Sequence, residues 1–359
     1  PGSMGIGDAA PTGCPCLGSV STKFVPFCPF GAVTFPPSER LMDGAGRTRA
    51  LALAVVLVSL TNPVAGQGAT GHDPAALAPR VDHVGTYVWD LSPEDFGGFS
   101  GLELSDDGSR YWALSDRGTL RWGSIDRDGQ GRIVRLTTAG SARLQDSRGR
   151  KLKPGYLGDA EGLAIDAEGR IFVSFEGLDR IARFDDPDEP AVVVPRAPAF
   201  RALKRNAGLE ALAVTPSGDL LTMPEDWREE DQGDGSSFPV WRFRNGAWST
   251  PYRLPRDPRW APVGADVGPD GKLYVLERDF RGVLGFSSRV RRFALSEDRL
   301  GPPELLLESI PLQYDNLEGI AVWADGQGIR VTMISDDNFL FVQQTQLVEF
   351  RVRERPGAP

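Results

Sequence analysis

The sequence predicts an all-β protein built from repeated units, and three observations support this prediction. A short phrase, in which a small or acidic residue precedes a Gly-Leu-Ala-like strand, occurs five times. A turn that ends in glycine, such as Asp106-Asp107-Gly108, follows each copy. A second strand rich in β-branched and aromatic residues then follows each turn. Repetition of one strand-turn-strand unit indicates a repeat architecture.

The spacing of the copies predicts the type of repeat. The copies are 100–104, 161–165, 210–214, 263–267 and 318–322. These intervals suit a propeller blade of four strands with long loops. We therefore predict a β-propeller with five four-stranded blades, or with six if the long first interval contains a degenerate blade.

The third and fourth strands of each blade can also be recognised. Apolar residues and arginine alternate in the predicted third strands, and we expect the arginines to face solvent. These strands are 180–184, 240–244, 289–293 and 347–352. Fourth strands such as 191–194 and 304–307 have no counterpart after the last repeat. We expect residues 84–89 to pair into the last blade, because closing the ring leaves no long unpaired edge.

The region before the repeats has the features of an export signal. A basic stretch begins at Met42, an apolar run follows at 50–60, and small residues end at Ala65. The predicted organisation is an upstream extension at 1–41, a signal peptide at 42–65, a linker at 66–80, the propeller at 81–353 and a flexible tail at 354–359. We expect a periplasmic or secreted monomer that is free of the membrane after cleavage.

Composition argues against several classes of function. The chain has 40 Lys and Arg against 49 Asp and Glu, so its net charge is −9 and nucleic acid is not an expected partner. All three cysteines precede residue 42, and the only histidines, His72 and His83, precede the first repeat. The sequence has no nucleophile elbow, Walker loop or dinucleotide fingerprint. Carboxylates, arginine, water and a bound metal remain for chemistry.

Equivalent residues of the repeats are expected to form two rings at one end of the channel, because the first strand of each propeller blade lines the axis. The first residues of the phrase form one ring, and the acids that end the second strands form the other. The first ring is Ser100, Glu161, Glu210, Val263 and Glu318. The second ring is Asp116, Glu176, Glu225 with Asp226, Glu277, and Asp336 with Asp337.

Crowded carboxylates repel one another unless a cation or protons neutralise them. Calcium takes about 6 to 8 oxygen ligands from carboxylates, carbonyls and amides, which the two rings and their approach loops offer. The expected cofactor is therefore a divalent cation, with calcium as the expected ion. The predicted metal ligands are Glu161, Glu210, Glu318, Asp159, Asn206, Asn316 and Asp336.

Such a site predicts a hydrolase. A cation can polarise an ester oxygen and acidify water while a spare carboxylate accepts the proton. An arginine can hold an anionic group or, equally, pair with a ring carboxylate and brace the site. The expected substrate is a small anionic ester, either phosphoric or carboxylic. The predicted catalytic residues are Glu161, Glu210 and Asp116. The predicted substrate-binding residues are Arg117, Arg180 and Arg278.

Four motifs occur in a characteristic order along the repeats. They are 115–118 in the first blade, 159–164, 206–213 and 316–321. In these motifs the chain resembles the bacterial phytase-like domain family, also called esterase-like activity of phytase, over residues 84–352. The resemblance implies an exported β-propeller with phosphoester or ester hydrolase activity, and calcium by analogy with propeller phytases. Ser100 and Val263 interrupt the glutamate ring, and no dense run of Lys and Arg suits phytate itself.

Two alternative functions stay open. A noncatalytic periplasmic propeller that binds a ligand or a protein would hold a structural cation in the channel, with Trp227 and the acidic loop 228–235 at its rim. A lactonase of the gluconolactonase kind would act on a neutral lactone and would need no arginine to hold it. The other strand tryptophans, such as Trp241 and Trp323, are expected to pack between blades.

Overall fold

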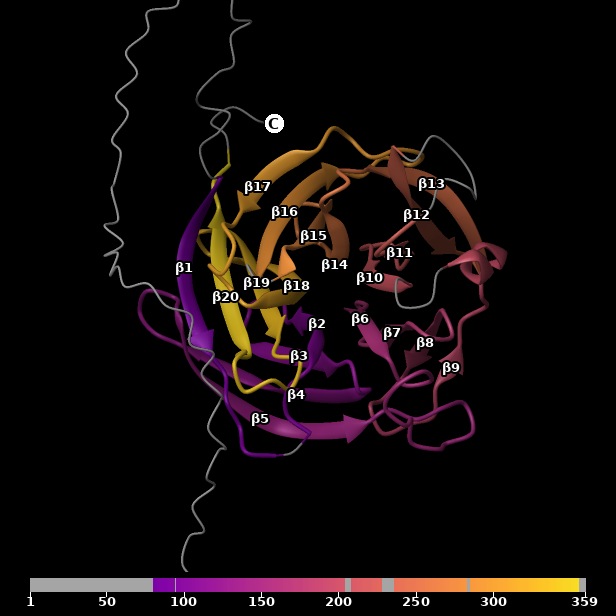
Figure 1. Cartoon of the computed structure of the whole chain (residues 1–359), viewed down its shortest axis with the longest axis horizontal. Coiled ribbons are helices and arrows are strands. Elements are labelled where there is room, and N and C mark those ends of the chain that lie inside the picture. Colours follow the sequence, from indigo (N-terminus) through magenta and orange to yellow (C-terminus); the bar gives the residue numbers. More distant parts are fainter. Residues whose placement is uncertain (1–79, 94, 204–207, 228–235, 283–284, 355–359) are drawn as a thin grey trace, which may run out of the picture. The chain divides into compact units, whose positions relative to one another are not determined.

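The computed structural model describes residues 80–93, 95–203, 208–227, 236–282 and 285–354. They form a β-propeller of five four-stranded antiparallel sheets arranged around a central axis (Figure 1). The five-blade prediction is confirmed, and the six-blade alternative is wrong. The predicted signal peptide lies outside the described residues. Within the described ranges, no helix is long and apolar enough to cross a membrane.

Four blades are formed by consecutive strands that run in chain order from the axis outward. The first is β2 (Phe99–Leu104), β3 (Arg110–Ser115), β4 (Thr119–Arg127) and β5 (Ile133–Arg143). The second is β6 (Ala160–Ile165), β7 (Ile171–Phe175), β8 (Arg180–Phe184) and β9 (Val192–Val193). The third is β10 (Leu209–Val214), β11 (Leu220–Pro224), β12 (Ser237–Arg244) and β13 (Ala247–Pro255). The fourth is β14 (Ala261–Val267), β15 (Lys272–Phe280), β16 (Phe286–Ala294) and β17 (Glu304–Glu308). A short 3-10 helix, η2 (Pro198–Ala202), precedes the third blade.

The fifth blade combines the two ends of the propeller. Its strands are β18 (Asn316–Asp325), β19 (Gly328–Asp336), β20 (Gln346–Val352) and β1 (Val81–Val88). The first strand, β1, pairs with β20 in antiparallel register from Val81↔Val352 to Val88↔Gln346, so that indigo and yellow strands lie side by side in Figure 1. The predicted closure of the ring by an N-terminal strand is therefore confirmed.

The hydrophobic core consists of layers between neighbouring blades. Leu114 of the first blade packs in one cluster with Val173 of the second, and Leu276 of the fourth packs in one cluster with Val331 of the fifth. The largest cluster joins the second, third and fourth blades. This packing holds the inner strands rigidly around the axis and so positions their ends.

The third-strand arginines only partly follow the prediction that they face solvent. Arg289, Arg291 and Arg292 are buried, with exposed fractions of 7%, 7% and 1%. Arg292 donates from Nε to Oε2 of Glu304 at 2.9 Å and from Nη1 to the hydroxyl of Tyr274 at 3.2 Å. A buried guanidinium is tolerated only with such partners. For these three residues the solvent-facing prediction is wrong.

Small residues at the second position of the phrase close the channel midway. Glycine occupies this position in four inner strands, and the third blade has Ala211 there. A Cβ atom added to Gly162 would lie 2.7 Å from the carbonyl oxygen of Glu210, and one added to Gly264 would collide with that of Glu318. Only about 10 Å³ of space remains between the strands, room for at most one water. The two mouths of the channel are therefore separate.

Candidate active site

A β-bulge near the start of every inner strand displaces the first residue of the repeated phrase from the regular ladder. The register shifts lie at Phe99/Gly101, Ala160/Leu163, Leu209/Ala211, Pro262/Gly264 and Leu317/Gly319. Each shift encloses one member of the predicted first ring. Because a bulge re-aims the side chain of its extra residue, the repeat of this irregularity gathers the glutamates at one mouth.

We define the acidic mouth by the residues that gather where the inner strands begin. They are Asp116, Asp159, Glu161, Glu176, Glu210, Glu225, Arg278, Asn316, Glu318 and Asp336. Glu210 and Glu318 are buried, with exposed fractions of 8% and 9%, and Asp336 is 6% exposed. The negative charge is thus concentrated in a poorly hydrated space.

In each blade an equivalent Cα pair joins a residue near the start of the first strand to one of the second strand. The residue that follows the second-strand member of this pair along the chain belongs to the second ring. These pairs are Phe99↔Ser115, Ala160↔Phe175, Leu209↔Pro224, Pro262↔Glu277 and Leu317↔Ser335. The ring is therefore Asp116, Glu176, Glu225, Arg278 and Asp336. The prediction that Glu277 belongs to this ring is wrong, because Arg278 occupies the position. A shift of one residue turns a strand side chain to the other face of the sheet. Glu277 is fully buried there and accepts from Nε of Arg289 at 2.9 Å and Nε of Arg291 at 2.6 Å.

Arg278 is the positive member of the second ring, and its guanidinium joins three residues of the acidic mouth. Nη2 donates to Oε1 of Glu225 at 2.7 Å, and Nη1 donates to Oδ1 of Asn316 at 3.0 Å and to Glu318. Asn316 also donates from its side-chain amide to Oε1 of Glu318 at 2.7 Å. Arg278 therefore neutralises the side of the mouth formed by the third and fifth blades.

The opposite side of the acidic mouth is formed by the second blade and has no such arginine among the described residues. One carboxylate oxygen from each of Asp159, Glu161 and Glu176 lies within 4.8 Å of the others. Oxygens bound to one calcium ion at about 2.3–2.6 Å lie no more than about 5 Å apart, so this spacing suits a shared cation. Glu176 is held in place by the backbone amide of Gly208, which donates to Oε1 at 3.1 Å.

The protonation of the acidic mouth reflects burial and mutual repulsion. Burial and then the charge of Glu210 raise the pKa of Glu161 well above its usual value. Burial and then Glu225 do the same to the pKa of Glu210. Burial also raises the pKa of Glu318, although Arg278 opposes the rise. A raised pKa means that the protonated form of each carboxylate is favoured unless a cation takes the place of the proton.

Three second-ring acids are shifted into the neutral range. Burial raises the pKa of Asp116 to about 6, of Glu176 to about 7 and of Asp336 to about 8. The charge of Arg117 opposes the shift of Asp116, and its guanidinium carbon lies 3.2 Å from the ring centroid of Phe339. A carboxylate with a pKa near 6 is suited to accept a proton at neutral pH.

Comparisons with known proteins identify the family. The family model of phytase-like proteins, described as esterase-like activity of phytase, matches residues 94–339. The chain belongs to this family. The match contains the whole acidic mouth and leaves out β1 and β20, which close the ring of this phytase-like propeller.

Solved structures show only a shared general fold. The PQQ-bound aldose sugar dehydrogenase of Streptomyces coelicolor is 12% identical, with 77% of this chain and 100% of that chain covered and a TM-score of 0.41. A gluconolactonase of Xanthomonas campestris is 16% identical, with 67% and 68% covered and a TM-score of 0.35. These likenesses carry no argument about the activity of the phytase-like chain. No curated protein matches the sequence.

Most of the predicted site residues meet at the acidic mouth of the phytase-like propeller. Arg180 instead donates from Nη2 to the carbonyl oxygen of Leu157 at 2.5 Å and lies over the ring of Phe175. Burial lowers the pKa of Arg180 to about 10. Asn206 lies outside the described residues. The prediction that Trp227 lies at the rim is wrong. Its side chain is 8% exposed and packs edge-on against Trp241.

Two features of the acidic mouth were not predicted: the place of Glu176 in the carboxylate group and the partner of Glu225. Glu176 was visible as a second-ring acid, and its register position opposite Asp159 is the signal that could have identified it. The partner of Glu225 is an arginine from the next blade, and sequence spacing alone does not predict such a contact.

Proposed function

We propose that the acidic mouth binds a divalent cation, calcium by the nature of its ligands, and hydrolyses a small ester of phosphoric or carboxylic acid. The observation that carries this proposal is the group formed by Asp159, Glu161 and Glu176, whose oxygens lie within 4.8 Å of one another without a basic partner among the described residues. The donor set is all oxygen, which hard cations prefer.

The ligands would be Asp159, Glu161 and Glu176, with Glu210 beside them. A bound cation would act as a Lewis acid that polarises a phosphoryl or carbonyl oxygen and makes water more acidic. Arg278 donates hydrogen bonds to Glu318 and Asn316, so the proposed role of these two residues is to hold the wall of the mouth. The proposal thus keeps the predicted cation, adds Glu176 to its ligands and leaves Glu318 and Asn316 out of contact with it.

The remaining acids of the mouth can move protons. Asp116 has a pKa of about 6, and its Oδ1 accepts from the hydroxyl of Ser115 at 3.2 Å, which orients the carboxylate. It is therefore the proposed general base. Arg117 stacks on Phe339 and has no ion pair among the described residues with a distance inside 4.0 Å, so it is the proposed contact for an anionic substrate.

One observation favours a lactonase as the second candidate. Of the three arginines predicted to hold an anionic substrate, Arg278 is bound to carboxylates and Arg180 is bound to a backbone carbonyl. A neutral lactone needs no arginine clamp, so a site with one available arginine among the described residues also suits a lactone carbonyl. A noncatalytic propeller remains the outcome if cation binding occurs without turnover.

The test combines calorimetry and kinetics on the metal-stripped full chain. We expect calcium binding and calcium-dependent hydrolysis of p-nitrophenyl phosphate, p-nitrophenyl acetate or gluconolactone. Both should be lost in Glu161→Gln and kept in Asp298→Asn, a control at an exposed carboxylate. Binding without turnover of any of these substrates would contradict the hydrolase and support the binding propeller. Absence of calcium binding would contradict the cation site itself.

A further inference from the structure

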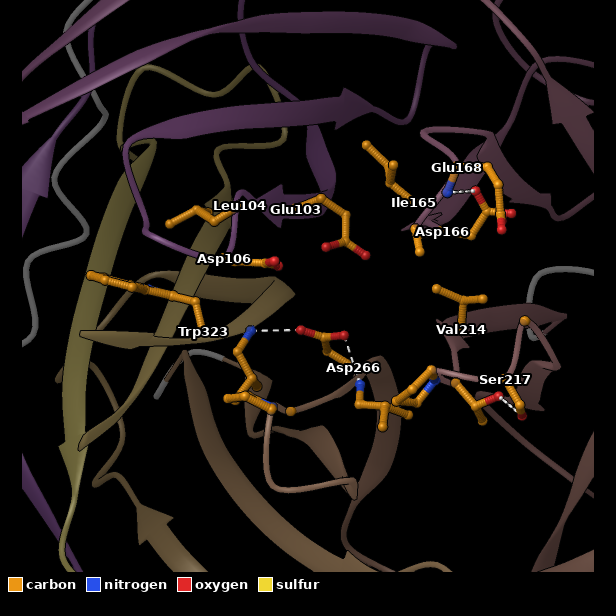
Figure 2. A pocket seen from close by; sticks show the side chains of 18 of the residues that line it. Glu103, Leu104, Asp106, Ile165, Asp166, Glu168, Val214, Ser217, Asp266 and Trp323 are labelled. Atoms are coloured by element: carbon orange, nitrogen blue, oxygen red, sulfur yellow. Dashed lines mark hydrogen bonds between the residues drawn. The ribbon is translucent and has the colours of Figure 1, made fainter. Parts of the chain in front are cut away.

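A second cavity lies at the opposite mouth of the channel, where the inner strands end. Its volume is about 730 Å³, within the range of about 300–1,000 Å³ typical of small-molecule sites (Figure 2). All five blades contribute to its wall, which includes Leu104, Ile165, Val214, Val267 and Val322. The cavity is therefore a funnel on the axis, in which one aliphatic side chain from each blade lies beside polar and acidic residues such as Asp106 and Thr215.

Two carboxylates from blades that are not neighbours extend into this funnel. Glu103 comes from β2 and Asp266 from β14, and Figure 2 shows their carboxylates facing each other across the space. Asp266 is 8% exposed and is fixed by two backbone amides, since Val267 donates to Oδ1 and Val322 donates to Oδ2, each at 2.6 Å. The position of at least one carboxylate is thus determined by the fold.

The two carboxylates have no cationic partner among the described lining residues. Arg170 is the base in that lining, and it is committed to other acids: Nε donates to Oδ2 of Asp166 at 2.6 Å, and Nη2 donates to Oε2 of Glu168 at 3.0 Å. Burial and then the charge of Asp266 raise the pKa of Glu103, and burial raises the pKa of Asp266 to about 7. Asp266 is buried and Glu103 is half-buried, so the facing pair is costly to ionise unless a cation binds between them.

The chemistry of the funnel distinguishes between kinds of cation. A calcium ion needs about 6 to 8 oxygen ligands. Here one aliphatic side chain from each blade lies among the polar lining residues, and both oxygens of Asp266 already accept hydrogen bonds from the backbone. An alkylammonium group needs only a few acceptors for its N–H groups, and its carbon chain can pack against Ile165 and Val214. The acidic mouth cannot supply or share this ligand, because the channel between the mouths is closed.

We propose that the opposite mouth is a binding site for a small aliphatic amine, whose ammonium group lies between Glu103 and Asp266 and whose carbon chain packs in the funnel. The site is independent of the proposed ester hydrolysis. It would make the propeller a two-site protein, with a metal site at one mouth and an amine site at the other.

The test uses 1,4-diaminobutane as the probe in calorimetry on the full chain at low ionic strength. We expect saturable binding with one site, and no binding of the neutral isostere 1,4-butanediol. Glu103→Gln and Asp266→Asn should each weaken the affinity at least tenfold. Glu161→Gln, at the acidic mouth, should leave it unchanged. A near-UV circular dichroism spectrum equal to that of the wild type shows that each variant is folded.

A second variant tests the site without relying on removal of a carboxylate. Ile165→Lys places an ammonium group in the funnel on the protein's own chain, and it should abolish diamine binding and raise the melting temperature. Three outcomes would overturn the proposal: no diamine binding, equal diamine binding in the Glu103 and Asp266 variants, or calcium binding that these variants remove while the diamine does not bind.

Discussion

The two mouths of the channel are formed by the same five strands, yet the blades divide their acids between them. The second, third and fifth blades have glutamate at the first position of the phrase and alanine at the fourth. The first and fourth blades have Ser100 and Val263 at the first position, and they have Glu103 and Asp266 at the fourth. The blades that interrupt the glutamate ring are therefore the ones that supply the two facing carboxylates of the opposite mouth.

The two mouths differ in how their side chains are aimed. At the acidic mouth a bulge displaces the first residue of each phrase from the ladder, and several carboxylates crowd together around Arg278. At the opposite mouth the strands are regular, and two facing acids project into a funnel that also has one aliphatic side chain from each blade. Strand irregularity thus gathers a ring of carboxylates at one mouth, whereas regular alternation places a single facing pair at the other.

The largest effect is expected when the only positive charge of the second ring is removed. Arg278→Met leaves Glu225 and Glu318 without their cation, and removal of one partner from a buried pair costs about 3–5 kcal/mol. We expect a loss of this size in the free energy of unfolding of the metal-stripped protein, measured in urea. Calcium should restore part of it. Arg299→Met, at an exposed site, should change the stability by less than about 0.5 kcal/mol.

A reciprocal pair of variants tests whether the two mouths bind their ligands independently. Glu161→Gln should reduce calcium affinity at least about 100-fold, because even residues that only orient metal ligands contribute about 10–100-fold. The same variant should leave the binding of 1,4-diaminobutane intact, and Glu103→Gln should show the opposite pattern. Calorimetry with both ligands on both variants measures this. Loss of both ligands in one variant would show that the mouths are coupled.

The third prediction concerns the closed middle of the channel, which separates the two mouths. Gly264→Ala brings a Cβ atom against the carbonyl oxygen of Glu318, and overpacking against rigid backbone costs about 1–3 kcal/mol. We expect the free energy of unfolding to fall by an amount near the upper end of this range, as measured by thermal unfolding. The matched control is Ala211→Gly at the equivalent position of the third blade, for which we expect about 0.5–1 kcal/mol. Equal losses of stability in the two variants would mean that the closed middle of the channel tolerates a side chain in every blade.

The fold was predictable from the sequence because each blade repeats the same local pattern, and because the missing last strand identified the closing strand 84–89. The site was only partly predictable. Glu277 and Arg278 are neighbours in sequence, and only strand register decides that Arg278 faces the channel. Glu103 and Asp266 carried a signal, since acid replaces alanine there in two repeats, but their meeting across the axis depends on how the blades close.

The pH dependence of stability separates the contributions of the two mouths. The pKa values of Asp116, Glu176 and Asp336 are raised to about 6, 7 and 8, so the folded protein holds protons that the unfolded chain releases above about pH 4. Their contribution to stability is complete below pH 4 and is lost as pH rises to 8. We expect the metal-stripped protein to melt at least about 5 °C lower at pH 8.5 than at pH 5.

Calcium should reduce the part of this pH dependence that comes from the acidic mouth, because it binds ionised carboxylates such as that of Glu176. Asp266, whose pKa is also raised to about 7, should contribute to the part that remains, and Asp266→Asn should reduce it. Melting curves of the wild type and of Asp336→Asn, with and without calcium, measure both parts. A melting temperature that rises between pH 5 and pH 8.5 in the metal-stripped protein would contradict the raised pKa values.

The smallest expected effect concerns Arg117, which within the described part of the chain is the predicted substrate-binding arginine that no carboxylate or carbonyl oxygen holds. Arg117→Met should raise the KM for p-nitrophenyl phosphate about fivefold, because a partly exposed ion pair contributes about 1 kcal/mol or less. The KM for p-nitrophenyl acetate should stay unchanged, since this ester carries no negative charge. Equal effects on both substrates would mean that Arg117 acts by holding Asp116 or Phe339 in place, and the lactonase would then become the better account of the acidic mouth.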